Sequence, residues 1–157
     1  MAFMLAFSLA FNIASNSIMK DYIDKIKPEF ILRLGLGGMY LYSGIDLILN
    51  PKGWTWALPY WYKQMISAFM LIENYLRFQG AVELLFAFLL LSFFFPKKVA
   101  MAVAALASAE FLFILLFAPQ FSVTFRDIGL LGAAFSLFLI LWQERKAVLN
   151  SANQKVP

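Results

Sequence analysis

The polar segments of the chain are separated by four stretches of almost continuous apolar residues, about Phe30–Leu49, Phe78–Phe95, Val99–Phe117 and Ile128–Trp142. A helix needs ~20 mostly apolar residues to cross the hydrocarbon core of a bilayer. Proline interrupts helices and belongs at their ends. Prolines flank these stretches at Pro28, Pro51, Pro96 and Pro119. The pattern predicts an all-α integral membrane protein built as a bundle of four transmembrane helices.

The N-terminal segment, residues 1–27, has a different pattern. Polar residues from Ser8 to Lys27 recur at helical spacing and form one polar stripe on an otherwise apolar helix. This stripe favours an amphipathic helix that lies in the plane of the membrane interface and ends at Pro28. A fifth span over residues 1–19 also agrees with the distribution of charges, and it remains the alternative.

Composition excludes a soluble enzyme. Of the 157 residues, 62% are apolar and 14% are charged, against ~45–50% and ~25% in ordinary soluble domains. The mean hydropathy is +0.76. A soluble domain of this size has too little interior to bury that much apolar surface. Because the chain has no Cys and no His, we expect no intrinsic cofactor, no metal site and no thiol chemistry.

Basic residues predict the orientation in the membrane. Eight of the 13 Lys and Arg residues lie before the first span, in the second loop or in the C-terminal segment, and Arg33, near the start of the first span, makes nine on this side against four on the opposite face. This bias predicts that both termini lie in the cytoplasm. We expect the membrane to be the plasma membrane of the cell. We expect a transmembrane domain over residues 28–143 and a cytoplasmic tail over 144–157. The net charge of +4 follows from this bias and gives no indication of nucleic-acid binding.

Small residues at helical spacing predict where the helices pack against each other. Gly37 and Gly44 share a face of the first span, and a series of Ala and Ser residues occupies positions 100–108 of the third. In the fourth span, Gly129 and Ala133 are spaced in the same way. Without a hydrophobic driving force between helices in lipid, close contacts rely on such residues. Each stripe is interpreted as a helix–helix seam, with a cavity lining as the alternative.

Ionisable side chains gather toward the predicted outer half of the bilayer. With the spans drawn above, Glu83 lies ~8 Å and Glu110 roughly 12 Å inside the outer boundary, at 1.5 Å rise per residue. Charges at this depth are costly and often functional. The candidate residues for a ligand pocket or proton relay are Glu83, Glu110, Asp46, Arg126, Asp127 and Arg77. We expect the two arginines to be the charge partners of the two glutamates.

Structural interpretations of the same residues remain open. Arg126 and Asp127 can form an ion pair that only locks helices together. Arg33 is expected to be an interface anchor whose long side chain reaches the headgroups. The aromatic segment 54–62 is interpreted primarily as an interfacial belt. The alternative interpretation is a lid over the pocket.

Three segments of the chain resemble the DoxX family: Leu32–Gly44, Gly80–Leu85 and Arg126–Ala134. Members are small four-helix membrane proteins of prokaryotes, similar to the membrane subunit of an archaeal thiosulfate:quinone oxidoreductase. The resemblance implies a quinone and other membrane or redox subunits as partners, beside the lipid bilayer. The positions that correspond to the family's recurrent residues are Arg33, Gly44, Gly80, Glu83, Arg126, Asp127 and Gly129. Asp46 departs from the family pattern, because many members carry a basic residue in that neighbourhood.

Three functions remain open at this stage. The first is a quinone-linked or redox-associated membrane subunit whose outer pocket holds a quinone head group. The second is a non-catalytic scaffold, assembly or lipid-binding protein. A transporter is less favoured, because transporters place polar groups near the midplane and show repeats. No catalytic motif decides whether the chain is an enzyme.

Overall fold

The computed structural model describes residues 26–117 and 121–153. The described part is all-helical, as predicted, and contains no strand. Its six helices are α3 (Pro28–Leu49), the short 3₁₀ helix η1 (Pro51–Ala57), α4 (Tyr60–Ser67), α5 (Ile72–Leu91), α6 (Lys97–Phe117) and α7 (Phe121–Asn153).

The chain divides into two compact units, residues 1–31 and 32–157. In the first unit the described residues are 26–31, which include the first residues of α3. The predicted amphipathic helix over residues 1–27, and the alternative span over 1–19, lie almost entirely outside the described residues. The architecture that follows is that of the second unit.

Within residues 26–117 and 121–153, three helices are long and apolar enough to cross a membrane: Ile72–Leu91, Lys97–Phe117 and the segment Arg126–Ser151 of α7. This finding supports the membrane class predicted from composition. Helix α3 occupies the first predicted span and has 22 residues. It is not among these three helices, because Arg33 and Asp46 lower its mean hydropathy.

The predicted boundaries of the second and fourth spans need correction. Helix α5 begins at Ile72, six residues before the predicted Phe78. Glu73, Leu76 and Arg77 in this added part have high helix propensity, but its polar residues lower the hydropathy that marked the predicted start. Helix α7 continues to Asn153, so residues 144–153 of the predicted tail are helical. Its polar end is rich in Gln, Glu, Arg, Lys and Ala, which have high helix propensity. The pattern of apolar residues identifies the apolar part of a helix and misses its polar ends.

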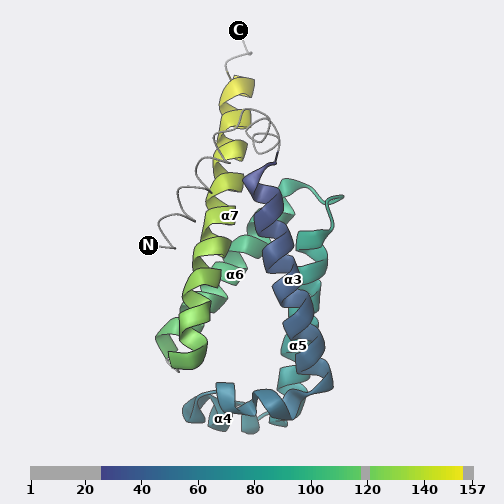
Figure 1. The fold of residues 1–157 in the computed structure, drawn as a ribbon, viewed down its shortest axis with the longest axis vertical. Helices are drawn as coiled ribbons and strands as arrows, with labels where there is room; N and C mark the ends of the chain where they lie inside the picture. The colour runs from purple at the N-terminus through teal and green to yellow at the C-terminus, as the bar shows by residue number, and fades with distance from the viewer. Residues whose placement is uncertain (1–25, 118–120, 154–157) are drawn as a thin grey trace, which may run out of the picture. The chain divides into compact units, whose positions relative to one another are not determined.

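Helices α3 and α5 run side by side in opposite directions (Figure 1) and meet at glycines. A Cβ atom on Gly44 would lie 2.8 Å from the carbonyl oxygen of Gly80, and one on Gly80 would lie 2.7 Å from that of Gly44. A Cβ atom on Gly37 would lie 2.7 Å from Cγ of Leu91. The two backbones therefore approach as closely as small residues permit, and Gly37 and Gly44 occupy the seam that their spacing predicts.

Helices α6 and α7 form the second close pair (Figure 1). Ala100, Ala104 and Ala107 of α6 are buried with Ala134 and Leu137 of α7. At the N-terminal end of α6, Lys97 and Glu144 form a salt bridge. Ala100 and Ala104 of the predicted series therefore belong to the core, whereas Ser108 is only partly buried.

The buried face of α7 differs from the predicted stripe. Gly129 is exposed, with no atom within 4 Å of a Cβ placed there, and Ala133 is only partly buried against the core. The buried positions are Asp127, Ala134 and Leu137, together with Leu141. The packing face of α7 thus consists of Ala134 and two leucines that follow the buried Asp127. The spacing of small residues predicted a neighbouring face instead.

Arg33 is buried rather than extended to an interface, which corrects its predicted role as an anchor. Its side chain is 3% exposed. Its Nε atom donates to the carbonyl oxygen of Leu90 at 2.8 Å and Nη2 donates to that of Ser92 at 3.0 Å. The guanidinium also lies 4.4 Å from the ring centre of Phe93. Arg33 therefore caps the C-terminal carbonyl groups of α5, where a cation is electrostatically favoured.

Candidate functional site: a polar cavity between the helices

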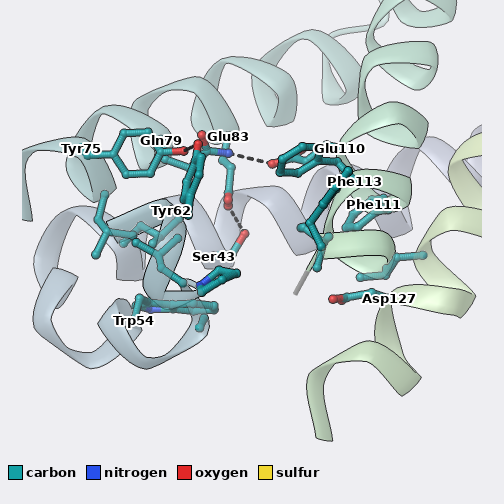
Figure 2. A pocket seen from close by; sticks show the side chains of 18 of the residues that line it. Ser43, Trp54, Tyr62, Tyr75, Gln79, Glu83, Glu110, Phe111, Phe113 and Asp127 are labelled. Atoms are coloured by element: carbon teal, nitrogen blue, oxygen red, sulfur yellow. Dashed lines mark hydrogen bonds between the residues drawn. The ribbon is translucent and has the colours of Figure 1, made fainter. Parts of the chain in front are cut away.

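A cavity of about 340 Å³ lies among α3, α5, α6 and the first turns of α7, with η1 and α4 contributing one side. This size is within the range of small-molecule pockets in proteins. Figure 2 shows its polar side chains converging from different helices. The polar or ionisable residues that line it are Tyr40, Ser43, Trp54, Tyr62, Tyr75, Gln79, Glu83, Glu110, Arg126 and Asp127.

Glu110 of α6 is held by two neutral donors. The hydroxyl group of Tyr40 on α3 donates to Oε2 at 2.9 Å, and Nε2 of Gln79 on α5 donates to Oε1 at 2.7 Å. Tyr40 is 1% exposed, and its ring stacks on Phe111 with centroids 5.9 Å apart. Three helices are therefore joined at one carboxyl group.

Glu83 of α5 lies beside Glu110. It is 9% exposed and accepts a hydrogen bond from the hydroxyl group of Ser43 on α3. Gln79, one helical turn before Glu83, donates to Glu110 (Figure 2). We refer to Tyr40, Ser43, Gln79, Glu83 and Glu110 as the glutamate cluster.

Both glutamates lie away from the ends of their helices. Because α5 begins at Ile72, Glu83 lies ~16 Å along the axis from the helix start at 1.5 Å per residue. Glu110 is ~10 Å from the end of α6 at Phe117 by the same rise. Both acids are therefore well inside the helices that carry them.

The two predicted arginine partners lie elsewhere. Arg126 lines the cavity, but its side chain is 61% exposed and its Nε atom lies 3.6 Å from Oδ1 of the buried Asp127. Arg77 is exposed and does not line the cavity. Within the described residues, the hydrogen bonds to Glu83 and Glu110 come from neutral side chains. Neutral donors satisfy the buried acids here, and Arg126 marks the accessible side of the cavity.

Asp46 lies behind the cavity wall. Its Oδ2 atom accepts a hydrogen bond from Nε1 of Trp54 at 2.8 Å, and its Oδ1 atom accepts one from Nδ2 of Asn50 at 2.8 Å. Trp54 lines the cavity whereas Asp46 does not. Asp46 is therefore a positioning residue, which holds the indole ring of η1 against the cavity.

The aromatic segment is part of the cavity wall. Trp54, Trp61 and Tyr62 line it from η1 and α4. The hydroxyl groups of Tyr62 and Tyr75 share a hydrogen bond of 2.7 Å, which ties α4 to α5. The secondary interpretation of this segment, as a cover over the pocket, describes its position better than an interfacial belt alone.

The rest of the wall is apolar, and part of it is aromatic. Phe111, Phe113 and Phe117 of α6 contribute three rings, and the centroids of Phe113 and Phe117 are 4.7 Å apart. Flat aromatic walls around a few polar groups suit a planar ligand ring.

The sequence interpretation did not identify Tyr40, Tyr62 and Tyr75 as site residues. By its spacing, Tyr40 shares a helix face with Gly37 and Gly44. The two other tyrosines occupy predicted membrane-boundary positions, where aromatic residues are common. Their signal is the phenol group itself, because a buried hydroxyl needs a hydrogen-bond partner. No group of three or more potential metal ligands is present in the described residues.

Comparison of the chain with family models, with curated proteins and with solved structures gives no match in any of the three.

Proposed function

We propose that this chain is a DoxX-like, quinone-linked membrane subunit with four transmembrane helices, in which the cavity binds the head group of the quinone. The observation that carries the proposal is the glutamate cluster beside an aromatic cavity. Two acids, Glu83 and Glu110, face a space of about 340 Å³ whose remaining wall is mostly apolar. Such a space accommodates a flat ring, and the acids can exchange protons with oxygen atoms on it.

The topology in this proposal follows the basic residues. Helix α3 is the fourth span beside the three apolar helices, and both termini are cytoplasmic. The end of the bundle that carries η1 and α4 then faces outward, so the cavity lies in the outer half of the bilayer. Arg126, at the accessible side, is placed to meet a carbonyl oxygen or an anionic group.

Conversion between a quinone and a quinol transfers two electrons and two protons. In this proposal Glu83 and Glu110 handle the protons. The electrons pass to or from a redox cofactor of another subunit, since the chain has no Cys or His to hold one. The chain therefore acts as the quinone site of a larger assembly.

The proposal is tested by thermal unfolding of the full chain in mild detergent, with a short-chain quinone added in oxidised or reduced form. A ligand at 100 times its Kd stabilises the folded state by about 2.7 kcal/mol, which corresponds to a rise in Tm of roughly 5 °C or more. The double variant Glu83→Gln/Glu110→Gln should lose this rise. Glu144→Gln, which changes an acid on the surface of α7, is the matched control and should retain it. Absence of any shift in the unsubstituted chain would contradict the proposal.

One observation favours a second candidate, a non-catalytic scaffold or lipid-binding protein. Every buried side-chain nitrogen and oxygen atom in the described residues has a hydrogen-bond partner. A cluster satisfied in this way needs no ligand, and joining α3, α5 and α6 is then its sole role. In that case the Glu83→Gln/Glu110→Gln variant loses stability, and neither form of the quinone changes the Tm of the unsubstituted chain.

A further inference from the structure

Most hydrogen-bond donors of the glutamate cluster are already engaged. Tyr40 and Gln79 donate to Glu110 at 2.9 and 2.7 Å, and Ser43 donates to Glu83. A hydroxyl group has one proton to donate and an amide has two. Among the described residues, the cluster therefore keeps one neutral donor for a ligand, the second N–H of Gln79.

Acceptor positions remain in the same cluster. The two oxygens of a carboxylate offer about four lone-pair positions, and the hydrogen bonds above occupy only part of them on Glu83 and Glu110. The hydroxyl oxygens of Tyr40 and Ser43 also accept. The polar part of the cavity therefore presents mainly acceptors, aimed from α3, α5 and α6 (Figure 2).

Few donors lie elsewhere on the wall. The indole N–H of Trp54 is bonded to Asp46, and the bond between Tyr62 and Tyr75 leaves one phenol proton. Trp61 brings one further indole N–H to the wall. Arg126 is beside Asp127 on the exposed side. Against these stand two acids whose free lone pairs face the cavity.

We propose that this cavity selects the reduced, hydroxyl-bearing form of its ligand, a ring of the hydroquinone class, over the oxidised dicarbonyl form. This inference rests on the proposed function and gives it a preferred ligand state. A hydroquinone carries two O–H donors, which ionised Glu83 and Glu110 can bind as charge-assisted hydrogen bonds and whose protons they can then accept. The carbonyl oxygens of a quinone would instead face the oxygens of these ionised carboxylates, with repulsion and unpaired acceptors on both sides.

The experiment compares decylubiquinol with decylubiquinone, which share the ring and the tail and differ by two hydrogen atoms. Each is titrated into the full chain in detergent under anaerobic conditions, and binding is measured by calorimetry. The quinol should bind with a Kd at least about tenfold lower, since sites that hydrogen-bond a substrate hydroxyl discriminate strongly against analogues without it. Equal affinities, or tighter binding of the quinone, would overturn the inference.

Matched variants locate the preference. Glutamine has nearly the shape of glutamate but brings N–H donors, so Glu110→Gln or Glu83→Gln should bring the two Kd values within about a factor of two. Glu144→Gln should keep the full difference. If neither ligand binds the unsubstituted chain, the proposed function fails together with this inference. If both bind without the expected preference, only this inference fails.

Discussion

Two sets of buried ionisable side chains in the same bundle have different surroundings. Arg33 is 3% exposed and its guanidinium binds backbone carbonyl groups at the end of α5. Glu83 and Glu110 are held by side chains, and both border a cavity of about 340 Å³. The first arrangement completes the hydrogen bonding of a helix end. The second leaves acceptor positions directed at open space.

The difference shows that burial of a charge is a weak sign of function on its own. Ionisable groups at membrane depth are functional candidates by default, yet Arg33 meets that criterion and has a structural contact set. What separates the glutamates is the adjoining space and the aromatic wall around it. The comparison therefore predicts stability effects at Arg33 and ligand effects at the cluster.

The largest effect on stability is expected at Arg33. Arg33→Met removes the donors to Leu90 and Ser92 and leaves buried carbonyl oxygens without partners, which should lower the free energy of unfolding by about 3 kcal/mol. Arg33→Lys keeps the charge and should recover part of this loss. Unfolding in mixed detergent micelles measures both. Equal stability of Arg33→Met and the unsubstituted chain would remove the contrast with the cluster.

The glycine contact between α3 and α5 gives the next effect. At Gly44 an added methyl group meets the carbonyl oxygen of Gly80 at 2.8 Å, so Gly44→Ala should force the helices apart at a cost of about 2 kcal/mol. The same unfolding assay measures this cost. The cavity borders this seam, so ligand affinity should fall as well. Retained stability and affinity would mean that the seam tolerates separation.

Asp46 is expected to act through Trp54. Asp46→Asn retains an oxygen acceptor but removes the charge from the hydrogen bond, which should lower the free energy of unfolding slightly. A double-mutant cycle of Asp46→Asn with Trp54→Phe should give a non-zero coupling free energy. Additive effects would show that the indole ring keeps its position without Asp46.

The smallest effect is expected at Gly129. Its Cβ position is open, so Gly129→Ala should meet no neighbour and should raise stability by up to about 1 kcal/mol through helix propensity. The same Gly→Ala substitution is therefore expected to raise the free energy of unfolding at Gly129 and to lower it at Gly44. A destabilisation at Gly129 comparable to that at Gly44 would restore the packing stripe predicted for α7.

These two glycines also show what the sequence could predict. Apolar periodicity and composition located the long helices and the membrane class, because both depend on local residue content. The seam at Gly44 and the lack of one at Gly129 depend on which neighbour faces each helix. That information is tertiary, and a small residue in a helix is compatible with either outcome.

The candidate site divides in the same way. That Glu83 and Glu110 lie inside long apolar helices was predictable from the hydropathy around them. Their partners were not: the arginines seemed suitable by charge, whereas Tyr40, Ser43 and Gln79 hold the acids. Neutral hydrogen-bond partners on other helices have no sequence signature, because their pairing depends on the rotation of each helix in the bundle.

The central claim is that the two glutamates hold a quinone-class molecule in the cavity. It is tested most directly by mass spectrometry of organic extracts from the full chain, purified gently from a membrane that contains quinones. We predict about one quinone-class molecule per chain in the unsubstituted protein and in Glu144→Gln, and at least a tenfold lower amount in Glu83→Gln/Glu110→Gln. Extracts without quinone, or equal amounts in the double variant, would contradict the account.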